Sequence, residues 1–360
     1  MDPLKLQKQL SPILKPISGL YGAAMRARHK AWETSSSRYT CDCPCVSVGN
    51  IAWGGTGKTP IVEWLMHWTA AERLRGVVLS RGYGAKVQNP PVRIVSRHAP
   101  WEVGDEPLML ALSCPSVPVL VDPERRRSAD WAIQHMRPQL VLLDDGFQHV
   151  ALARDLDLVL LRPADLREEW NRVIPAGSWR ESADALERAG AFLIKCSPDE
   201  LHALAPSIVT RLERFGKPVF SFQLVPRCLR RVGGAETMPA PELVQHPYIL
   251  LTGVGEPEQV KHTVADFMGY DPMECIFKPD HHRFAFDEVQ ALARRRHMVI
   301  CTAKDAVKLR MLPAPNFWYL ETDVHFGPAV WTEQNFPEWW ASWWRNNALS
   351  PQPDPVVTFR

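Results

Sequence analysis

Short apolar runs alternate with longer amphipathic stretches between residues 45 and 222. The runs are nearly continuous in Val, Leu, Ile and Phe, which is typical of parallel strands with helices on both faces of the sheet. They occupy residues 46–48, 77–79, 117–121, 140–143, 156–161, 192–194 and 219–222. The pattern therefore predicts a doubly wound α/β domain with a parallel central sheet, over residues 36–225.

A second, smaller α/β lobe is predicted over residues 248–345. Its expected strands are 248–252, 298–302 and 316–320, and its expected helices are 258–268 and 286–296. Between the lobes, residues 226–247 contain Gly233-Gly234 and several prolines, which indicates a linker or an irregular hairpin. Residues 346–360 are rich in proline and polar groups, so we expect a loose tail. A cleft between two such lobes is a usual place for a ligand.

The N-terminal segment, residues 1–35, is expected to form an amphipathic, basic helix. Apolar residues recur at helical spacing among lysines and arginines, and they are Leu10, Ile13, Leu14, Ile17, Leu20 and Met25. The longest uncharged stretch, 16–25, is shorter than the roughly 20 residues that span a bilayer. The helix could lie on an anionic membrane surface or pack on the neighbouring domain, and the residues leave both interpretations open.

Composition and charge add only a little about the number of domains, the partners and the compartment. A chain of 360 residues that is 46% hydrophobic can bury a core in each of two domains. Lys and Arg number 42 against 40 Asp and Glu, so no overall field favours nucleic acid or membrane. With no secretory signal recognised, the eight cysteines are expected to be reduced thiols in the cytoplasm. Cys41, Cys43 and Cys45 lack a second pair of ligands at zinc-site spacing.

A glycine-rich turn lies between the first predicted strand and the next helix. It reads Gly54, Gly55, Thr56, Gly57, Lys58 and Thr59. Backbone N–H groups in such a turn, together with the helix N-terminus, surround a phosphate, while the lysine reaches the β- and γ-phosphates. The threonine hydroxyl would bind magnesium. Ala52 replaces the first glycine of the general phosphate-loop pattern, so the match depends on the compact core that follows. A purely structural strand-to-helix turn is the alternative.

A second motif supports nucleotide binding, because an apolar strand ends in Asp144 and Asp145. Carboxylates at the carboxyl end of a buried strand beside a phosphate loop are how P-loop proteins hold their metal ion. The sequence thus predicts ATP and Mg²⁺ as cofactors, with Thr59, Asp144 and Asp145 as the expected metal ligands. Glu106, which lies outside this motif, is a further expected ligand.

The order and spacing of several short motifs resemble the tetraacyldisaccharide 4′-kinase (lipid A 4′-kinase) family over most of the chain. The motifs include Ser80-Arg81-Gly82-Tyr83, Gly104-Asp105-Glu106-Pro107, Asp144-Asp145-Gly146-Phe147-Gln148-His149, Pro279-Asp280-His281-His282 and Thr302-Ala303-Lys304-Asp305-Ala306-Val307-Lys308. The resemblance implies a P-loop fold with two lobes and transfer of the ATP γ-phosphate to the 4′-hydroxyl of a tetraacyl glucosamine disaccharide 1-phosphate. It also implies a membrane-associating N-terminal helix at the cytoplasmic face of the inner membrane of a Gram-negative bacterium.

Candidate catalytic residues follow from this chemistry and from the resemblance. A sugar hydroxyl is a poor nucleophile, so a carboxylate near it would take its proton. Asp105 falls on the motif of the family's catalytic aspartate, although an aspartate before a helix can also be an N-cap. The resemblance implies that Asp280 and His281 orient this base. Lys58 is the further candidate catalytic residue, and it would act on the phosphates. The alternatives for the second-lobe residues are a helix cap before the predicted helix 286–296 and, for the pair His281 and His282, a metal site. A catalytic role would require the lobes to close.

Further residues are candidates for binding. Arg81 and Arg125 offer forked donors to the anionic or polar head of the acceptor, although Arg125 could also belong to a solvated helix start. Gln148 and His149 follow the acidic pair closely enough to face the nucleotide, or they could close that turn.

Two other functions compete with the kinase. A P-loop ATPase that drives conformational change or partner assembly could use the same loop, although Trp53 stands where some such ATPases have a second lysine. A soluble small-molecule kinase is the nearest alternative enzyme. No basic domain or aromatic–basic motif indicates nucleic acid as a partner.

Overall fold

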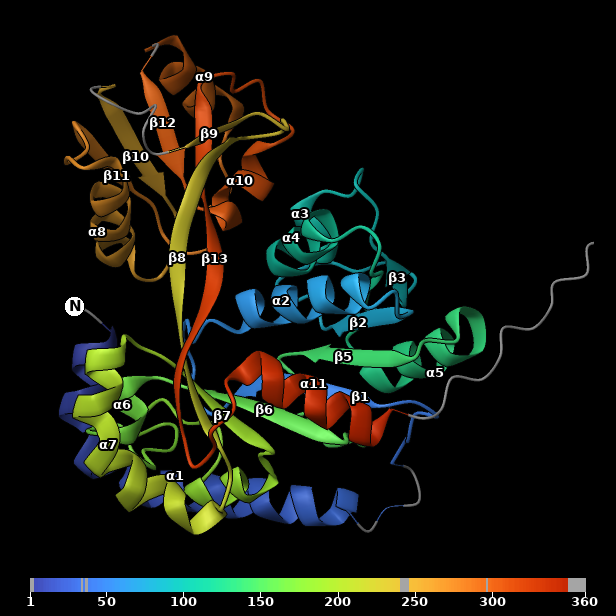
Figure 1. Ribbon diagram of the computed structural model, residues 1–360. Coiled ribbons are helices and arrows are strands. Elements are labelled where there is room, and N and C mark those ends of the chain that lie inside the picture. The colour runs from blue at the N-terminus through green and yellow to red at the C-terminus, as the bar shows by residue number, and fades with distance from the viewer. Residues whose placement is uncertain (1–2, 34, 36–37, 240–245, 296, 349–360) are drawn as a thin grey trace, which may run out of the picture.

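The computed structural model describes residues 3–33, 35, 38–239, 246–295 and 297–348, which fold into two lobes (Figure 1). Two long strands, β8 (Val219–Arg231) and β13 (Phe317–Val330), run from one lobe into the other. They pair antiparallel along most of their lengths. The lobes are therefore joined by hydrogen-bonded backbone.

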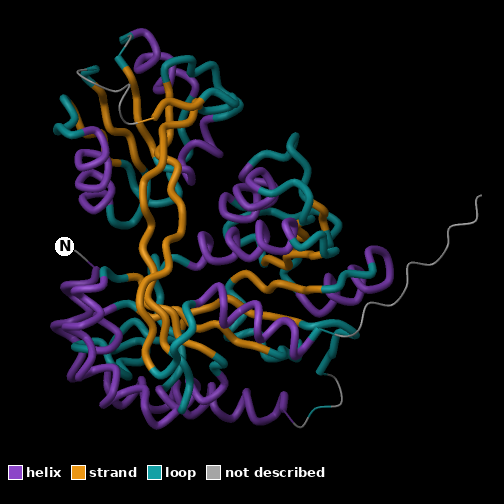
Figure 2. Tube along the Cα trace, viewed as in Figure 1, coloured by secondary structure: helices purple, strands orange, loops and turns teal. Residues whose placement is uncertain are grey.

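The larger lobe contains a parallel sheet whose strands are almost entirely buried. Helices lie on both sides of it, which explains why the apolar runs have no polar face (Figure 2). The strands are β1 (Cys45–Asn50), β2 (Gly76–Ser80), β4 (Val119–Val121), β5 (Leu140–Asp144), β6 (Leu156–Leu161) and β7 (Ala191–Lys195), with an antiparallel edge strand β3 (Val92–Arg93). The helices are α2 (Lys58–Ala71), α3 (Pro100–Val103), α4 (Asp105–Ser113), α5 (Arg125–Met136), α6 (Pro163–Leu166) and α7 (Pro198–Leu212), with 3-10 turns η1 (Ala183–Arg188) and η2 (Glu213–Phe215). The predicted doubly wound fold is confirmed.

The smaller lobe has its own parallel strands and a separate apolar core. The strands are β10 (Tyr248–Thr252), β11 (Glu274–Phe277) and β12 (Met298–Cys301), and the helices are α8 (Pro257–Met268), α9 (Phe286–Arg294) and α10 (Ala303–Leu309). The sequence pattern did not indicate β11 or α10. Both are short, and β11 has no fully buried residue, so neither carries a clear apolar period.

The connection between the lobes differs from the predicted linker at 226–247. Strand β8 continues through Pro226 to Arg231 and then turns at Gly233, which has φ of 73°, into β9 (Thr237–Pro239). A proline is tolerated in this strand because the register with β13 shifts between Glu321 and Thr322. All strands then form one sheet, in the order β11-β10-β12-β13-β8-β7-β6-β1-β5-β2-β4-β3, with β9 beside β8. Residues 240–245 lie outside the described residues.

The last helix, α11 (Phe336–Asn347), packs on the larger lobe although its sequence was assigned to the smaller one. Strand β13 runs back into the larger lobe before α11 begins. There Trp340 is fully buried and contacts Trp68 of α2 edge to face, with ring centroids 5.3 Å apart. The expected tail, 346–360, begins within this helix, and residues 349–360 lie outside the described residues.

The N-terminal helix α1 (Pro3–Glu33) packs along the larger lobe with one face and exposes another. Buried Ser11 accepts a hydrogen bond of 2.9 Å from Arg172 Nη2, and the Ser18 hydroxyl accepts one of 3.0 Å from the Ala176 N–H. Ile13, Ile17 and Leu20 are on an exposed face, with 73%, 52% and 75% of their surface accessible. Within the described residues, no helix has the length and apolarity needed to cross a membrane.

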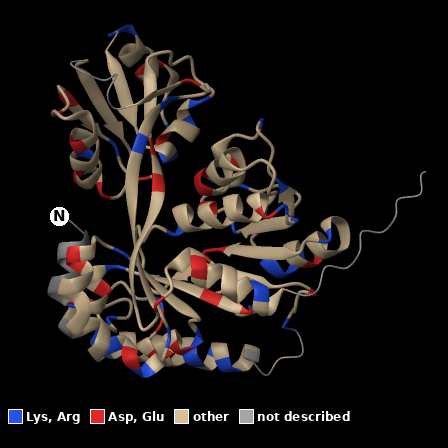
Figure 3. Ribbon diagram, in the orientation of Figure 1, with Lys and Arg blue, Asp and Glu red and all other residues tan. Residues whose placement is uncertain are grey.

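Charged residues of both signs are interspersed over both lobes (Figure 3). This distribution agrees with the formal net charge of +2. Any preference for an anionic ligand therefore depends on local groups of side chains.

Candidate active site

The phosphate loop follows β1 and ends where α2 begins. Gly57 is the N-cap of α2 with φ of 86°, in the left-handed region that favours glycine, and a Cβ there would lie 3.0 Å from the ring of Phe222. Thr56 is buried, and its Oγ1 accepts a hydrogen bond of 3.1 Å from Asn50 Nδ2. A Cβ on Gly55 would meet nothing within 4 Å. Contacts at Thr56 and Gly57 thus fix the loop on one side. The loop is open at Gly55, where its N–H groups can bind an anion.

The two residues before the paired glycines attach this loop to the segment around Trp179. Ala52 is fully buried and forms a β-bridge with Trp179, and the N–H of Trp53 donates to the Ser178 carbonyl at 2.9 Å. Gly54, with φ of 111°, then starts the turn. The alanine that replaces the usual first glycine therefore belongs to a bridge that anchors the start of the loop.

The acidic pair lies beside the loop lysine. Asp144 ends β5, and Asp145 follows with its Oδ1 3.5 Å from Lys58 Nζ and its Oδ2 accepting from Arg180 Nη1 at 3.0 Å. Burial would raise the pKa of Asp145, but the charges of Lys58 and Arg180 outweigh it and lower that pKa. Asp144 accepts a hydrogen bond of 2.9 Å from Ser80 Oγ, yet burial and then the charge of Asp145 raise the pKa of Asp144 to about 6. A cation arriving here would stabilise the ionised form.

The other expected metal ligands are split between two places. Thr59 is in the first turn of α2, next to Lys58, whereas Glu106 on α4 forms an ion pair of 2.9 Å with Lys304. Across the described chain, no set of three or more His, Cys, Asp or Glu side chains is gathered into a metal site. Mg²⁺ keeps waters and binds through one or two carboxylates and substrate phosphates, so a hydroxyl and a carboxylate pair beside a phosphate loop fit it.

Gln148 connects the end of β1 to the acidic pair. Its Nε2 donates to the Asn50 carbonyl at 2.9 Å, and its Oε1 accepts from Arg180 Nη1 at 3.0 Å. For His149, burial first and then the charge of Arg125 lower the pKa to about 3, so the imidazole is neutral at physiological pH. These contacts favour the local structural role that the sequence left open for Gln148.

The arginines expected at the acceptor have different surroundings. Arg125 is 4% exposed, and its Nη1 donates to the Asp145 carbonyl at 2.8 Å, so it belongs to the acidic pair's environment. Its neighbours Arg126 and Arg127 have half-exposed side chains, which limits the solvated helix start to those two. Arg81 is exposed just after β2.

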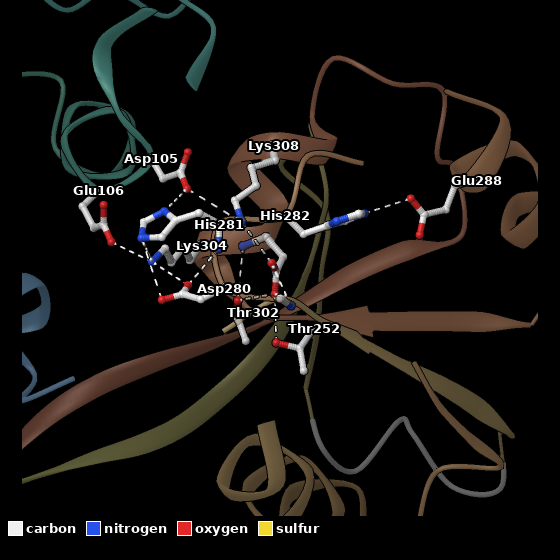
Figure 4. Close-up of polar contacts among 12 residues, drawn as sticks. Asp105, Glu106, Thr252, Asp280, His281, His282, Glu288, Thr302, Lys304 and Lys308 are labelled. Atoms are coloured by element: carbon white, nitrogen blue, oxygen red, sulfur yellow. Dashed lines mark hydrogen bonds and ion pairs between the residues drawn. The ribbon is translucent and has the colours of Figure 1, made fainter. Parts of the chain in front are cut away.

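The second half of the site brings the lobes together (Figure 4). Asp105 is in the first turn of α4, with Gly104 as the N-cap residue, so its carboxylate does not cap the helix. Asp105 Oδ2 lies 3.2 Å from Nδ1 of His281, a residue of the other lobe 176 positions away. Asp280 Oδ1 accepts from the His281 backbone N–H at 2.9 Å, and His281 has φ of 60°. The contact between the lobes that a catalytic role for these residues would require is therefore present in this structure.

His282 points away from this pair. Its Nε2 lies 3.1 Å from Glu288 Oε2, and Lys278 Nζ lies 2.6 Å from the other oxygen of Glu288. Of the two consecutive histidines, only His281 therefore reaches Asp105.

Three charged residues of α10 that were given no role from sequence complete the second half. Lys304 contacts Glu106, while Lys308 Nζ lies 3.7 Å from Asp105 Oδ2 and 3.5 Å from Asp305 Oδ1. Asp305 is fully buried and accepts from the Thr302 hydroxyl at 2.7 Å. The run 302–308 was noticed only as part of the resemblance, because short charged helices give no indication of which partners they meet.

A phosphate loop with an acidic strand end, and a carboxylate–histidine pair between two lobes, define a P-loop ATP-dependent phosphotransferase. Helices α2 and α4, which start at Lys58 and Asp105, contact each other, so the two parts lie on neighbouring helices.

The comparisons with known proteins agree with this class. Residues 10–335 match the family described as Tetraacyldisaccharide-1-P 4'-kinase. The chain is 49% identical to a tetraacyldisaccharide 4'-kinase of Nitratidesulfovibrio vulgaris, covering 96% of this chain and 97% of the relative. It is 46% identical to one of Oleidesulfovibrio alaskensis, covering 97% and 99%. A crystal structure of "apo" form LpxK from Aquifex aeolicus in complex with ATP is similar with a TM-score of 0.75 and 27% identity, over 94% of this chain and all of that one. The chain belongs to the tetraacyldisaccharide-1-P 4'-kinase family.

Proposed function

We propose that this protein transfers the γ-phosphate of ATP to the 4′-hydroxyl of a tetraacyl glucosamine disaccharide 1-phosphate, giving the 4′-phosphorylated lipid A precursor. Family membership supports the reaction. The observation that carries the mechanism is the 3.2 Å contact between Asp105 and His281, because it supports a role for a carboxylate that is held from both lobes.

In the proposed reaction, Asp105 is the general base. Its carboxylate takes the proton as the acceptor oxygen forms a bond to the γ-phosphorus, and the bond from that phosphorus to the β–γ bridging oxygen breaks to release ADP. His281 and Asp280 orient the carboxylate. Lys58 stabilises the charge on the phosphates, and Gly54 to Thr59 hold them through backbone N–H groups.

Magnesium is the metal that the acidic pair fits best. Thr59, Asp144 and Asp145 would hold it, and bound Mg²⁺ neutralises charge that develops on the transferred phosphoryl group. Asp145 forms ion pairs with Lys58 and Arg180, and their charges keep its carboxylate in the ionised form that a metal ion would bind. Glu106, expected from sequence as a further ligand, contacts Lys304 in this structure.

Arg81 and Arg125 are proposed to serve the acceptor's polar head in different ways. Arg81 is exposed and free to approach a ligand, whereas Arg125 is held against the Asp145 carbonyl. Arg125 is therefore proposed to act indirectly, by positioning the acidic pair. Arg81 is proposed to contact the acceptor directly.

The decisive experiment follows labelled γ-phosphate into three acceptors in detergent. The first is the lipid A disaccharide precursor, the second is the same molecule with hydrogen in place of the 4′-hydroxyl, and the third is its water-soluble deacylated form. We expect transfer to the first acceptor alone, and only with magnesium. ATP hydrolysis without labelled glycolipid would point to the P-loop ATPase. Equal transfer to a water-soluble deacylated sugar would point to a soluble small-molecule kinase.

The exposed face of α1 is proposed to bind the cytoplasmic surface of the inner membrane. Its apolar side chains, Ile13, Ile17 and Leu20, are spaced by four and three residues and so share one face. Burying each apolar side chain contributes about 1.5–3 kcal/mol. The packed face keeps the helix on the protein, so surface association is favoured.

Replacement of Ile13, Ile17 and Leu20 by Asp tests the membrane proposal on the full-length chain. We expect binding to anionic vesicles to weaken at least about 100-fold, because each tenfold corresponds to about 1.4 kcal/mol. The control is Val209→Asp, an exposed apolar residue of α7 with 45% of its surface accessible. Equal vesicle binding by the triple variant and the control would reject the proposal.

A further inference from the structure

The ammonium of Lys304 lies at the centre of the polar contacts between the lobes (Figure 4). Its Nζ is 2.9 Å from Glu106 Oε1, 3.2 Å from Asp280 Oδ1 and 3.3 Å from His281 Nε2. Only 19% of its side chain is exposed. A lysine ammonium has three hydrogens, and here each has one acceptor.

The charge state of Lys304 follows from the same neighbours. Nζ lies within hydrogen-bond distance of two carboxylates, those of Glu106 and Asp280, and both stabilise the charged form of the lysine. The side chain is thus an ammonium, which has no lone pair and can only donate. The nitrogen that it meets, Nε2 of His281, must be the acceptor and carry no proton.

The other nitrogen of His281 meets a group of the opposite kind. Nδ1 lies 3.2 Å from Asp105 Oδ2, and a carboxylate oxygen accepts. Nδ1 therefore carries the proton and donates it. In the reverse tautomer, a hydrogen would face the ammonium and a lone pair would face the carboxylate, so both contacts would become repulsive.

The remaining charged and polar neighbours of His281 do not change this assignment. Asp280 Oδ2 is 3.8 Å from Nε2, too far for a hydrogen bond. Lys308 Nζ lies 3.7 Å from Asp105 Oδ2, the same oxygen that His281 approaches, and Tyr83 offers only a tilted ring 6.5 Å away between centroids.

We propose that Lys304 is a positioning residue that holds His281 in the tautomer protonated on Nδ1, and through it orients Asp105. This inference rests on the proposed function, in which Asp105 is the base. Both described contacts of the Asp105 carboxylate, from His281 and Lys308, go to Oδ2, so Oδ1 is the oxygen that takes the acceptor's proton. Because Glu106 belongs to the first lobe, Lys304 also makes the correct tautomer dependent on the lobes being together.

The kinetic test compares Lys304→Met with Lys304→Arg in the glycolipid transfer assay. We expect methionine to lower kcat by about 30-fold, within the range for residues that orient a catalytic group, and to leave the KM for ATP within about twofold. Arginine keeps the charge and donates only, so it should recover most of the lost kcat. Lys261→Met on α8 of the same lobe is the control for loss of a lysine.

The spectroscopic test uses histidine labelled with ¹⁵N, with the His281 signals identified by their absence in His281→Gln. In the wild-type chain, the Nδ1 signal should be that of a protonated nitrogen and the Nε2 signal that of an unprotonated one. Lys304→Met should show a mixture of the two tautomers. A wild-type His281 protonated on Nε2 would overturn the proposal, whatever the kinetics show.

The outcomes also separate this proposal from the one on which it depends. Full kcat in Asp105→Asn would overturn the proposal that Asp105 is the general base. Loss of kcat in Asp105→Asn with full kcat in Lys304→Met would overturn only the positioning role. If Lys304→Met does not fold by thermal denaturation, Lys304→Arg decides: kcat within about threefold of wild type supports the role, and a loss as large as that of Asp105→Asn overturns it.

Discussion

The two halves of the active site differ in how far apart their parts lie along the chain. The nucleotide half is centred on the contiguous residues 54–59 and receives its carboxylates from the end of an adjacent strand, β5. The interlobe half joins Asp105 of α4 to His281, which is 176 positions away, and to Lys308 of α10. A contiguous loop encodes its own geometry, whereas the interlobe half exists only while two lobes are held together.

The comparison teaches that catalytic groups and the groups that orient them can have different origins. In the nucleotide half, backbone N–H groups would do much of the proposed binding, and local φ values and the start of α2 position them. In the interlobe half, side-chain charges from α4 and α10 position one another. Substitutions in the second half should therefore act mainly on kcat, and those in the first on nucleotide binding as well.

The largest effect is expected in the interlobe half, from Asp105→Asn. An amide cannot accept the acceptor's proton, and a general base contributes about 10²–10⁴-fold, so we expect kcat to fall by about 1,000-fold. Steady-state transfer to the glycolipid measures this. Asp287→Asn, an exposed aspartate in the first turn of α9, is the control and should retain activity. A tenfold loss or less would mean that the interlobe half only positions the acceptor.

Lys58→Met comes next and probes the nucleotide half. It removes a charge from the phosphates and an ion pair from Asp145, so we expect kcat/KM for ATP to fall by about 300-fold, within the range for one group that stabilises transition-state charge. A matched control is Lys217→Met, outside the site in the turn before β8. If kcat falls while the KM for ATP is unchanged, the two halves would not differ as described.

The buried carboxylate of Asp144 gives a stability prediction. Its pKa is raised from 3.8 to about 6, so above pH 6 the folded nucleotide-free chain carries an ionised group that the unfolded chain accommodates more easily. The ionised carboxylate therefore lowers the free energy of unfolding by ~3 kcal/mol above pH 6. This loss disappears as the pH falls from about 6 to below 4. Asp144→Asn should therefore increase the free energy of unfolding by ~3 kcal/mol at pH 8, with a smaller gain at pH 5.

Chemical denaturation at the two pH values checks this, with the exposed Asp199→Asn as control. The same variant should lose the stabilisation that magnesium and ATP give the wild type. An equal gain at both pH values would show that the stabilisation by Asp144→Asn does not come from removal of the charge.

The smallest effect is expected for His282→Gln. This histidine contacts Glu288 and not Asp105, so transfer should stay within about threefold of wild type, whereas His281→Gln should lose about 100-fold as an orienting group. Glycolipid transfer at saturating ATP distinguishes the two. Equal losses would mean that the second-lobe loop acts as a unit and that the separation of His281 from His282 has no functional meaning.

Much of this organisation could be predicted from sequence where a short segment determines its own conformation. The apolar runs of β1, β5 and β6 placed the parallel sheet, and Gly57 with Lys58 placed the phosphate loop at the start of α2. The long pairing of β8 with β13 was not predictable in the same way. Its residues are half-buried and include Pro226 and Pro328, which in isolation indicate a break.

The sequence by itself determined the kind of chemistry, because backbone conformation and apolar period are local properties of a few adjacent residues. Only the tertiary structure decided which of two consecutive histidines meets Asp105, and that Lys304 lies between Glu106, Asp280 and His281. Those partners come from α4, α10 and the loop before α9. Their meeting depends on how the shared sheet sets one lobe against the other, which no run of residues specifies alone.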